Sequence, residues 1–284
     1  MGIIMNYPQN KMKAFTMSYD DGLVHDIKLI EIMKKHGLKG TFNINSERYS
    51  KEDNLSNEGM LSIEQTKKLY MQEGIEVAVH TATHPTMVDL PSEVLTFEII
   101  KDRNLLEKRF NTFIRGMANP NGAYNDKAIA SMKACGIAYA RTIDASRNFD
   151  IPSEWLKWNP TCHHNEPKLF ELGENFINMK VNRQHEWTAK LFYLWGHSSE
   201  FEIDNNWDRI EKFAELIGGK DDIWYATNIE IYDYIKAFNQ LIFNVEGNMC
   251  YNPTSTDLYF SCQNRCYEVK AGQTLTNINY FEWE

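Results

Sequence analysis

The sequence predicts an α/β fold in which about seven parallel strands are wrapped by helices, either as a barrel or as a doubly wound sheet. Short apolar runs of strand length alternate with amphipathic helical segments from residue 12 to 241. Glycine stops and serine or threonine caps separate the two kinds of segment. Polar side chains directly follow several of the apolar runs, and the functional sites of parallel α/β proteins lie at those strand ends.

The predicted elements follow one another in a regular order, with capping-box spacing at Ser62 and Thr227 and a stop at Gly37. Beyond residue 244, short runs broken by turn residues predict antiparallel strands. We therefore expect a barrel domain over 1–243 and a small β-rich appendage over 244–284. Strands are expected at 14–17, 40–44, 75–79, 113–118, 137–143, 191–195 and 223–225, and helices at 23–36, 62–71, 91–110, 126–135, 165–180, 205–217 and 227–241.

Composition limits the classes of partner. The chain has 284 residues, 43% of them hydrophobic, and a net charge of −9, which argues against a nucleic-acid partner because phosphate binding needs a basic face. No run approaches the ~18 apolar residues of a membrane span, so no membrane partner is expected. The five cysteines are scattered, which favours reduced thiols. We expect a cytoplasmic protein without a secretory signal, although a removed leader would leave the same sequence.

The first predicted strand ends in two adjacent carboxylates, Asp20 and Asp21, followed by Gly22. Adjacent residues at a strand end point in different directions, so one carboxylate can bind a cation while the other meets substrate. The glycine allows a sharp turn directly after them. A strand followed by an Asp-Asp-Gly turn without function is the alternative interpretation.

Two histidines four residues apart, His80 and His84, follow the third predicted strand. In a helical turn both could reach one cation, although this spacing also occurs by chance. With Asp21 they form a two-histidine, one-carboxylate set, which suits a catalytic zinc or a non-haem iron. Asp20 could then act as general base, and His197, after a later strand, as general acid. Alternatively, His197 is a strand-end histidine bonded to a backbone carbonyl.

Four motifs follow one another along the chain: Thr-x-x-Tyr-Asp-Asp-Gly, His-Thr-x-x-His, Asn-Pro-Asn-Gly and Leu-Trp-Gly-His. In this order they resemble the polysaccharide deacetylase family, the NodB-homology group of carbohydrate esterase family four. The resemblance covers roughly 12–241. It implies a distorted (β/α) barrel and metal-dependent removal of acetyl groups from an N-acetylated sugar.

The resemblance implies a role for each matched residue. Asp20 would be the general base and His197, in the closing motif, the general acid. Asp21, His80 and His84 would hold a divalent metal, most often zinc, with cobalt or nickel as alternatives.

The third motif departs from the family's Arg-Pro-Pro-Tyr-Gly pattern. Asn121 stands where that pattern has tyrosine, and its backbone N–H would help to stabilise the oxyanion. The arginine that normally flanks the base would fall at Ala118. Arg115 need not point inward, so we predict that Arg141, at the next strand end, pairs with Asp20 instead.

Two parts of the expected site lack a clear match. The family's Asp-x-x-Asp-Trp motif is absent, so the partner that orients the general acid is unassigned. His163 and His164 could bring an imidazole to metal or substrate, or form a polar loop with one core histidine. Tyr124 and Trp195 could pack on a sugar ring, with core packing as the alternative.

Together these features predict a metal-dependent hydrolase that acts on carbon–nitrogen bonds other than peptide bonds. It would remove acetyl groups from an N-acetylated, or alternatively O-acetylated, carbohydrate. Two other functions remain open at this point. One is a C–N hydrolase of a small non-sugar amide, and the other is a carbohydrate-binding pseudoenzyme.

Overall fold

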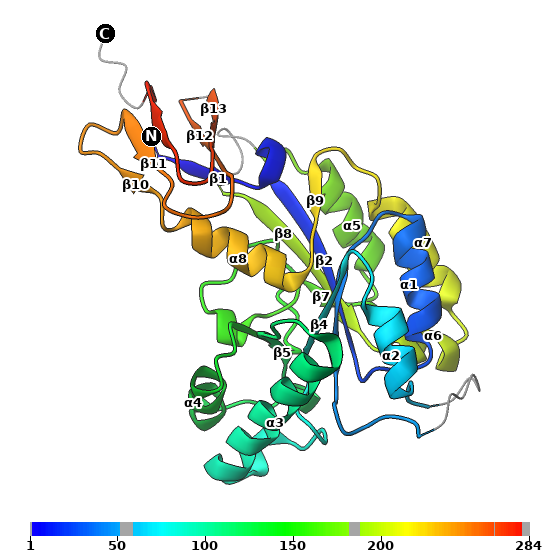
Figure 1. Ribbon diagram of the computed structural model, residues 1–284. Helices are drawn as coiled ribbons and strands as arrows, with labels where there is room; N and C mark the ends of the chain where they lie inside the picture. The colour runs from blue at the N-terminus through cyan, green and yellow to red at the C-terminus, as the bar shows by residue number, and fades with distance from the viewer. Residues whose placement is uncertain (1, 52–58, 182–187, 264, 280–284) are drawn as a thin grey trace.

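The computed structural model describes residues 2–51, 59–181, 188–263 and 265–279 (Figure 1). Its main sheet is parallel and has eight strands, in the order β6-β5-β4-β3-β2-β8-β7, with β9 also paired to β2. The predicted α/β class is confirmed. The strands are β2 (Lys13–Asp20), β3 (Gly40–Ile44), β4 (Ile75–Val79), β5 (Gly116–Ala118), β6 (Tyr139–Arg141), β7 (Cys162–His163), β8 (Lys190–Gly196) and β9 (Ile223–Tyr225).

Strand β2 lies at the centre of the sheet, and every one of its residues is buried. On one side it pairs with β8 along nearly its whole length. β9 pairs with its first residues, Lys13–Phe15, and β3 pairs with its last ones, Met17–Asp20. The carboxyl end of β2 is therefore held between two neighbouring strands, which fixes the backbone that carries the first two acids.

The segment 158–163 joins the two edges of the curled sheet. Trp158 donates its backbone N–H to the carbonyl of Ala140 at 2.9 Å and accepts from Thr142 at 3.0 Å, both next to β6. A few residues later Thr161 donates to the carbonyl of Tyr193 at 2.8 Å, and β7 pairs with β8. These bonds link β6 to β8 and give the distorted barrel that the sequence predicts. Strand β7 itself was not predicted.

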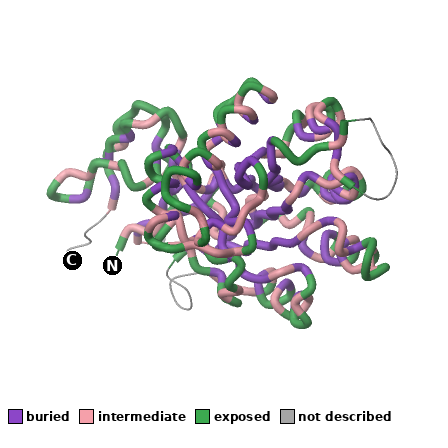
Figure 2. Tube along the Cα trace, turned by 90° about the horizontal axis from the view of Figure 1, so that it is seen from below, coloured by how far each residue is buried: buried purple, intermediate pink, exposed green. Residues whose placement is uncertain are grey.

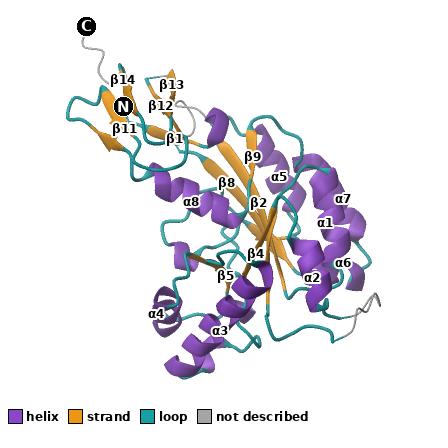
Figure 3. Ribbon diagram, in the orientation of Figure 1, coloured by secondary structure: helices purple, strands orange, loops and turns teal. Residues whose placement is uncertain are grey.

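Helices surround the sheet (Figure 3). Both predicted capping boxes are present, at Ser62 with Gln65 and at Thr227 with Glu230. The helix α6 was not predicted. Of the described helices, none is long and apolar enough to cross a membrane. The helices are α1 (Asp26–Lys35), α2 (Ile63–Tyr70), α3 (Ser92–Phe110), α4 (Asp126–Ala134), α5 (Leu169–Asn178), α6 (Ser198–Ile203), α7 (Trp207–Ile217) and α8 (Asn228–Phe238).

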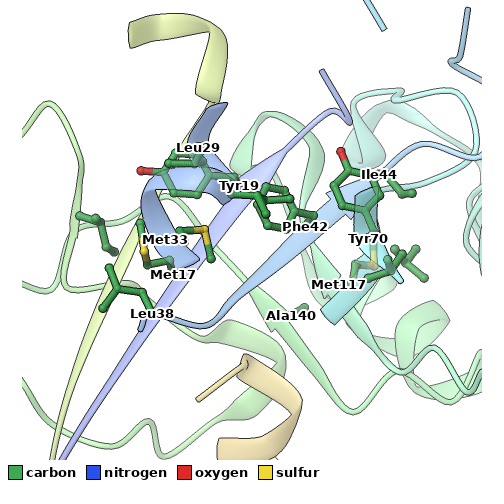
Figure 4. Close-up of a cluster of buried hydrophobic side chains, with 14 of the residues drawn as sticks. Met17, Tyr19, Leu29, Met33, Leu38, Phe42, Ile44, Tyr70, Met117 and Ala140 are labelled. Atoms are coloured by element: carbon green, nitrogen blue, oxygen red, sulfur yellow. The ribbon is translucent and has the colours of Figure 1, made fainter. Parts of the chain in front are cut away.

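The core lies between the outer face of the sheet and the helices. Figure 4 shows Met17 and Phe42 of the sheet with Met33 of α1 and Tyr70 of α2 in one buried cluster. Figure 2 shows the same division along the chain, with buried segments in the middle and exposed ones at the periphery. Burial of this apolar surface holds the helices against the strands.

The other face of β2 is polar and buried. Thr16 and Ser18 are both fully buried and point opposite to the apolar residues between them, as alternation along a strand requires. Thr16 donates to Asn228 at 2.8 Å, and Asn43 of β3 donates to Ser18 at 2.7 Å. Hydrogen-bonded polar side chains thus lie on this face of β2, and Asp20 continues the row at the strand end.

Two small antiparallel sheets form beyond the barrel. One sheet consists of β10 (Ile242–Phe243), which lies within the range expected for the barrel, and of β11 (Met249–Tyr251) and β14 (Thr274–Thr276) of the expected appendage. The other contains β12 (Leu258–Cys262) and β13 (Arg265–Val269) of the appendage. The second sheet is completed by β1 (Ile4–Asn6), which pairs with β12 (Figure 1). The first residues of the chain, inside the range expected for the barrel, therefore pair with a strand of the expected appendage.

Candidate metal and catalytic site

Residues from three strand ends meet at the carboxyl edge of the barrel. Asp20 ends β2 and Asp21 follows it, His80 follows β4 together with His84, and His197 follows β8. Because β2, β4 and β8 belong to one parallel sheet, their carboxyl ends open on the same edge. The structure therefore brings together the five residues to which the sequence assigned acid, base and metal roles.

Asp20 is held on both of its carboxylate oxygens. Its Oδ1 accepts a hydrogen bond of 2.8 Å from Asn43 Nδ2, and its Oδ2 accepts one from Arg141 Nη2. Asp20 and Arg141 are almost completely buried, with 3% and 1% of their surfaces exposed. The predicted ion pair is therefore present and inward-facing. Arg115, the alternative, pairs with Asp233 at the surface.

The surroundings of Asp20 favour its ionised form. Burial alone would raise the pKa of this carboxyl, but the positive charge of Arg141 and the nearby imidazoles of His80 and His197 lower it overall. His80 Nε2 and His197 Nε2 lie 4.0 and 3.8 Å from Asp20 Oδ2. Asp20 is thus a fixed carboxylate that faces two imidazoles.

Asp21 turns away from Asp20 because its backbone is left-handed, with φ at +80°. Its N–H donates to the carbonyl of Asn43 at 2.9 Å, which secures the turn. Asp21 Oδ1 lies 3.9 Å from His80 Nε2 and 3.7 Å from His84 Nε2. The half-exposed guanidinium of Arg48 approaches the same oxygen at 3.6 Å.

His80 is oriented as a cation ligand should be. Its Nδ1 lies 2.9 Å from the carbonyl of Ala118 and donates to it, which leaves the lone pair on Nε2, facing Asp21. The backbone N–H of His80 donates to the buried carboxylate of Asp102 at 2.9 Å. Burial lowers the pKa of His80, which favours the neutral imidazole that binds metals.

These groups fit a divalent cation. One ligand atom from each of Asp21, His80 and His84 lies within 4.8 Å of the others. Asp21 Oδ1 is buried, and among the described residues it has no hydrogen-bond partner, as expected of an oxygen that binds a cation. Two imidazoles and one carboxylate leave coordination positions open for water and substrate.

His197 is oriented by Glu200, the residue that sequence reasoning missed. Its Nδ1 lies 3.2 Å from Glu200 Oε1, one turn later in α6, and its Nε2 faces Asp20. Burial would lower the pKa of His197, but the carboxylates of Glu200 and Asp20 raise it overall. Glu200 is thus the contact partner of His197 that the sequence left unassigned. The signal was the spacing in Gly-His-Ser-Ser-Glu, with the acid three residues after the imidazole.

His163 and His164 contact Glu200 instead of the expected cation site. His163 Nε2 and His164 Nε2 lie 3.0 and 2.9 Å from Glu200 Oε2. The ring of His164 is buried and stacks on Phe201, and burial lowers its pKa to about 4. His164 is therefore a core histidine, the second of the two interpretations left open for this pair, while His163 lies at the rim.

The remaining predicted residues lie around this centre. Asn121 sits in a turn after β5 with φ at +55°, and its side chain donates to Thr86 at 3.0 Å. Tyr124 lines a hollow of about 370 Å³ together with residues of the loop 146–159. Trp195 is buried, and its ring lies 4.2 Å from the guanidinium carbon of Arg141. Whether any of them touches substrate stays a prediction.

Asn43 and Asp102 also escaped the sequence reading. Asn43 holds Asp20 through its side chain and Asp21 through its carbonyl, and the signal was a polar residue inside the apolar strand β3. Asp102 accepts from the backbone of His80 and of Ser46, the latter at 2.7 Å. Its signal was a carboxylate on the apolar stripe of α3, where burial raises its pKa to about 7.

Comparison with known proteins bears on this geometry. Residues 8–140 match the family model described as polysaccharide deacetylase. The resemblance to polysaccharide deacetylases is confirmed. The polysaccharide deacetylase match includes Asp20, Asp21, His80 and His84, whereas His197 lies outside it. Among curated proteins, none matches the chain.

One solved structure shows the same fold, and two others are similar to this chain with TM-scores below 0.5. A proposed polysaccharide deacetylase from Mycobacterium smegmatis is 14% identical, with a TM-score of 0.60 over 84% of this chain and 95% of that one. The Streptococcus pyogenes deacetylase PplD, in complex with acetate, is 22% identical with a TM-score of 0.43, over 50% of this chain and 61% of that one. A family-four pseudoenzyme from Bacillus anthracis is 20% identical with a TM-score of 0.48, over 81% and 68%.

Proposed function

We propose that this protein is a metal-dependent hydrolase that removes acetyl groups from an N-acetylated or O-acetylated carbohydrate. One observation carries the proposal. A buried carboxylate, Asp20, faces the imidazole of His197 at 3.8 Å directly beside the group of Asp21, His80 and His84. A base and an acid thus flank a set of cation ligands, as metal-assisted hydrolysis requires.

Asp21, His80 and His84 would hold the cation, with zinc the first candidate and cobalt or nickel next. A divalent cation in that place polarises an acetyl carbonyl and lowers the pKa of water. The contribution of this chain is the geometry. His80 keeps its lone pair toward the site because Ala118 accepts its other ring proton.

Asp20 removes a proton from the attacking water. Arg141 and Asn43 each hold one of its oxygens, so the carboxylate cannot rotate away, and it stays ionised at neutral pH because its pKa is lowered. The Arg141 guanidinium supplies the charge that the family's arginine at the position of Ala118 would supply.

His197 gives a proton to the departing amine or alcohol. Glu200 accepts from Nδ1, which directs Nε2 toward the reacting groups, and the raised pKa keeps His197 protonated further into the neutral range. The backbone N–H of Asn121 would stabilise the oxyanion that forms on the acetyl oxygen when water attacks the carbonyl carbon. Asp20 takes one proton from water and His197 gives one proton to the leaving group, so the two proton transfers balance.

A panel of N-acetylated and O-acetylated sugars, incubated with zinc, cobalt or nickel, tests the proposal by measuring released acetate. We expect release that depends on the metal and is lost in Asp20→Asn. If the protein retains metal and binds glycans but releases no acetate from any of them, it is a binding module and the proposal is wrong. Release from small non-sugar amides alone would replace the substrate class.

A further inference from the structure

The carboxylate of Glu200 lies among three imidazoles. Its Oε1 faces His197 Nδ1 at 3.2 Å, while its Oε2 lies 3.0 Å from His163 Nε2 and 2.9 Å from His164 Nε2. The side chain of Glu200 is itself 30% exposed, so the barrel wall does not confine it. What holds this carboxylate in place therefore decides whether it can orient the general acid.

The tautomer of His163 makes its Nε2 a hydrogen donor. The backbone N–H of Asn165 points at His163 Nδ1 at 3.1 Å, so this nitrogen accepts and carries no proton. In the neutral ring the proton then sits on Nε2, which faces Glu200. In this tautomer His163 Nε2 offers no lone pair to a cation, so we interpret its 3.0 Å approach to Glu200 Oε2 as an ion-pair contact and not as part of a second metal site.

His164 forms a fixed wall behind the same oxygen. Its ring packs between Tyr19, at an interplanar angle of 13°, and Phe201, at 30°. It also fills the space opposite Gly196, where an added Cβ would lie 2.0 Å from His164 Nδ1. The ring cannot move away from Glu200 without disturbing β8, so it limits where Oε2 can go.

We propose that His163 is a positioning residue for the general acid: it anchors Glu200 Oε2 from the solvent side and thereby aims Oε1 at His197 Nδ1. The catalytic consequence rests on the proposed function, but the geometric claim does not. His163 is 25% exposed and does not touch Asp20 in the described structure, so it acts through Glu200 and not on the reacting groups.

Other charges also face His197 and must be held constant in a test. Asp20 approaches from β2, and Arg141 of β6 neutralises that carboxylate. Neither Asp20 nor Arg141 contacts His163 in the described part of the chain. The groups that face His197 are Asp20 and Asp21 after β2, Glu200 of α6, and His163 and His164 at β7.

Loss of the anchor and loss of a charge predict opposite results. If His163 anchors Glu200, His163→Leu frees the carboxylate to rotate into solvent, and the pKa of His197 falls by about one unit. If His163 acts only by drawing negative charge from Glu200, its removal strengthens the pull on His197 and the pKa rises. The sign of the shift therefore distinguishes positioning from electrostatics.

NMR titration of labelled histidine in the full chain, with and without zinc, measures the pKa of His197 directly and needs no substrate. We expect a fall of about one unit in His163→Leu and a smaller fall in His163→Gln, whose amide can still donate to Glu200. His36→Leu is the matched control, because His36 Nε2 contacts Glu211 at 3.2 Å on the outer helices. An unchanged or raised pKa of His197 in His163→Leu would overturn the inference.

Two further measurements separate this inference from the proposed function. Zinc titration should show the same number of bound ions in His163→Leu as in the unchanged protein; loss of an ion would overturn the inference by making His163 a ligand. On an active sugar, the basic limb of the kcat profile should move to lower pH while KM stays constant. Failure to find any active sugar would contradict the proposed function and leave the NMR result standing.

Discussion

Replacing Arg141 by methionine removes the guanidinium that pairs with Asp20 inside the barrel. The side chains of Arg141 and Asp20 are 1% and 4% exposed, so water cannot take over from the lost partner. The guanidinium also lies 4.2 Å from the ring of Trp195, an interaction that disappears with the charge. Methionine keeps much of the volume, so packing around the site changes little.

The expected loss in the free energy of unfolding is about 3–5 kcal/mol at neutral pH, because a buried carboxylate is left without its partner. The sign of the pH dependence follows. With Arg141 present, the lowered pKa of Asp20 stabilises the folded state above the usual aspartate pKa, and this contribution disappears as pH falls through the folded pKa. Without Arg141, burial raises the pKa, so the difference between variant and unchanged protein should shrink toward pH 4.

Urea denaturation of the metal-free protein at pH 7 and pH 5, followed by circular dichroism, measures these differences. The second substitution Asp20→Asn should restore a large part of the loss in Arg141→Met, since it removes the uncompensated charge. Arg115→Met is the matched control, because Arg115 pairs with Asp233 at the surface and should cost less than about 1 kcal/mol. Equal losses for the two arginines, or no rescue by Asp20→Asn, would refute the reasoning.

Three further substitutions test other parts of the structure. Gly196→Ala places a Cβ 2.0 Å from His164 Nδ1 and should lower stability by about 1–3 kcal/mol in thermal unfolding. Ser62→Ala removes one half of a capping box and should cost about 1 kcal/mol with activity unchanged. Glu200→Gln removes the carboxylate that raises the pKa of His197; protonation of that imidazole is then lost at lower pH, and the basic limb of kcat should move down. A limb that stays in place would contradict the assigned orientation.

Regular elements were predictable because their signals are local. The strand over 40–44 and the strand over 75–79 have the expected bounds, and both capping boxes form where their spacing placed them. Strand β7 and helix α6 escaped prediction because they have two and six residues, too few for a periodic pattern. Strand β7 depends on pairing with β8, and α6 packs against α1 and α7, so both depend on residues that are distant in the sequence.

The residues of the candidate site likewise include some that the sequence predicts and some that it does not. Asp20, His80 and His197 could be brought together in advance because the ends of parallel strands share one edge of a sheet. Arg141 could be chosen for the same reason, since it ends another strand of the same parallel sheet. Glu200 could not, because it lies on the unpredicted α6, and its contact with His197 depends on how that helix starts.

Zinc binding and acetate release, measured side by side in Asp20→Asn and Asp21→Asn, test the central claim that these adjacent carboxylates have different roles. We predict that Asp20→Asn binds zinc as the unchanged protein does but loses about 10²–10⁴-fold in turnover of an acetylated sugar. Asp21→Asn should lose zinc affinity together with activity, because one ligand of the set is replaced. Substantial turnover in Asp20→Asn, or unchanged zinc affinity in Asp21→Asn, would contradict the account.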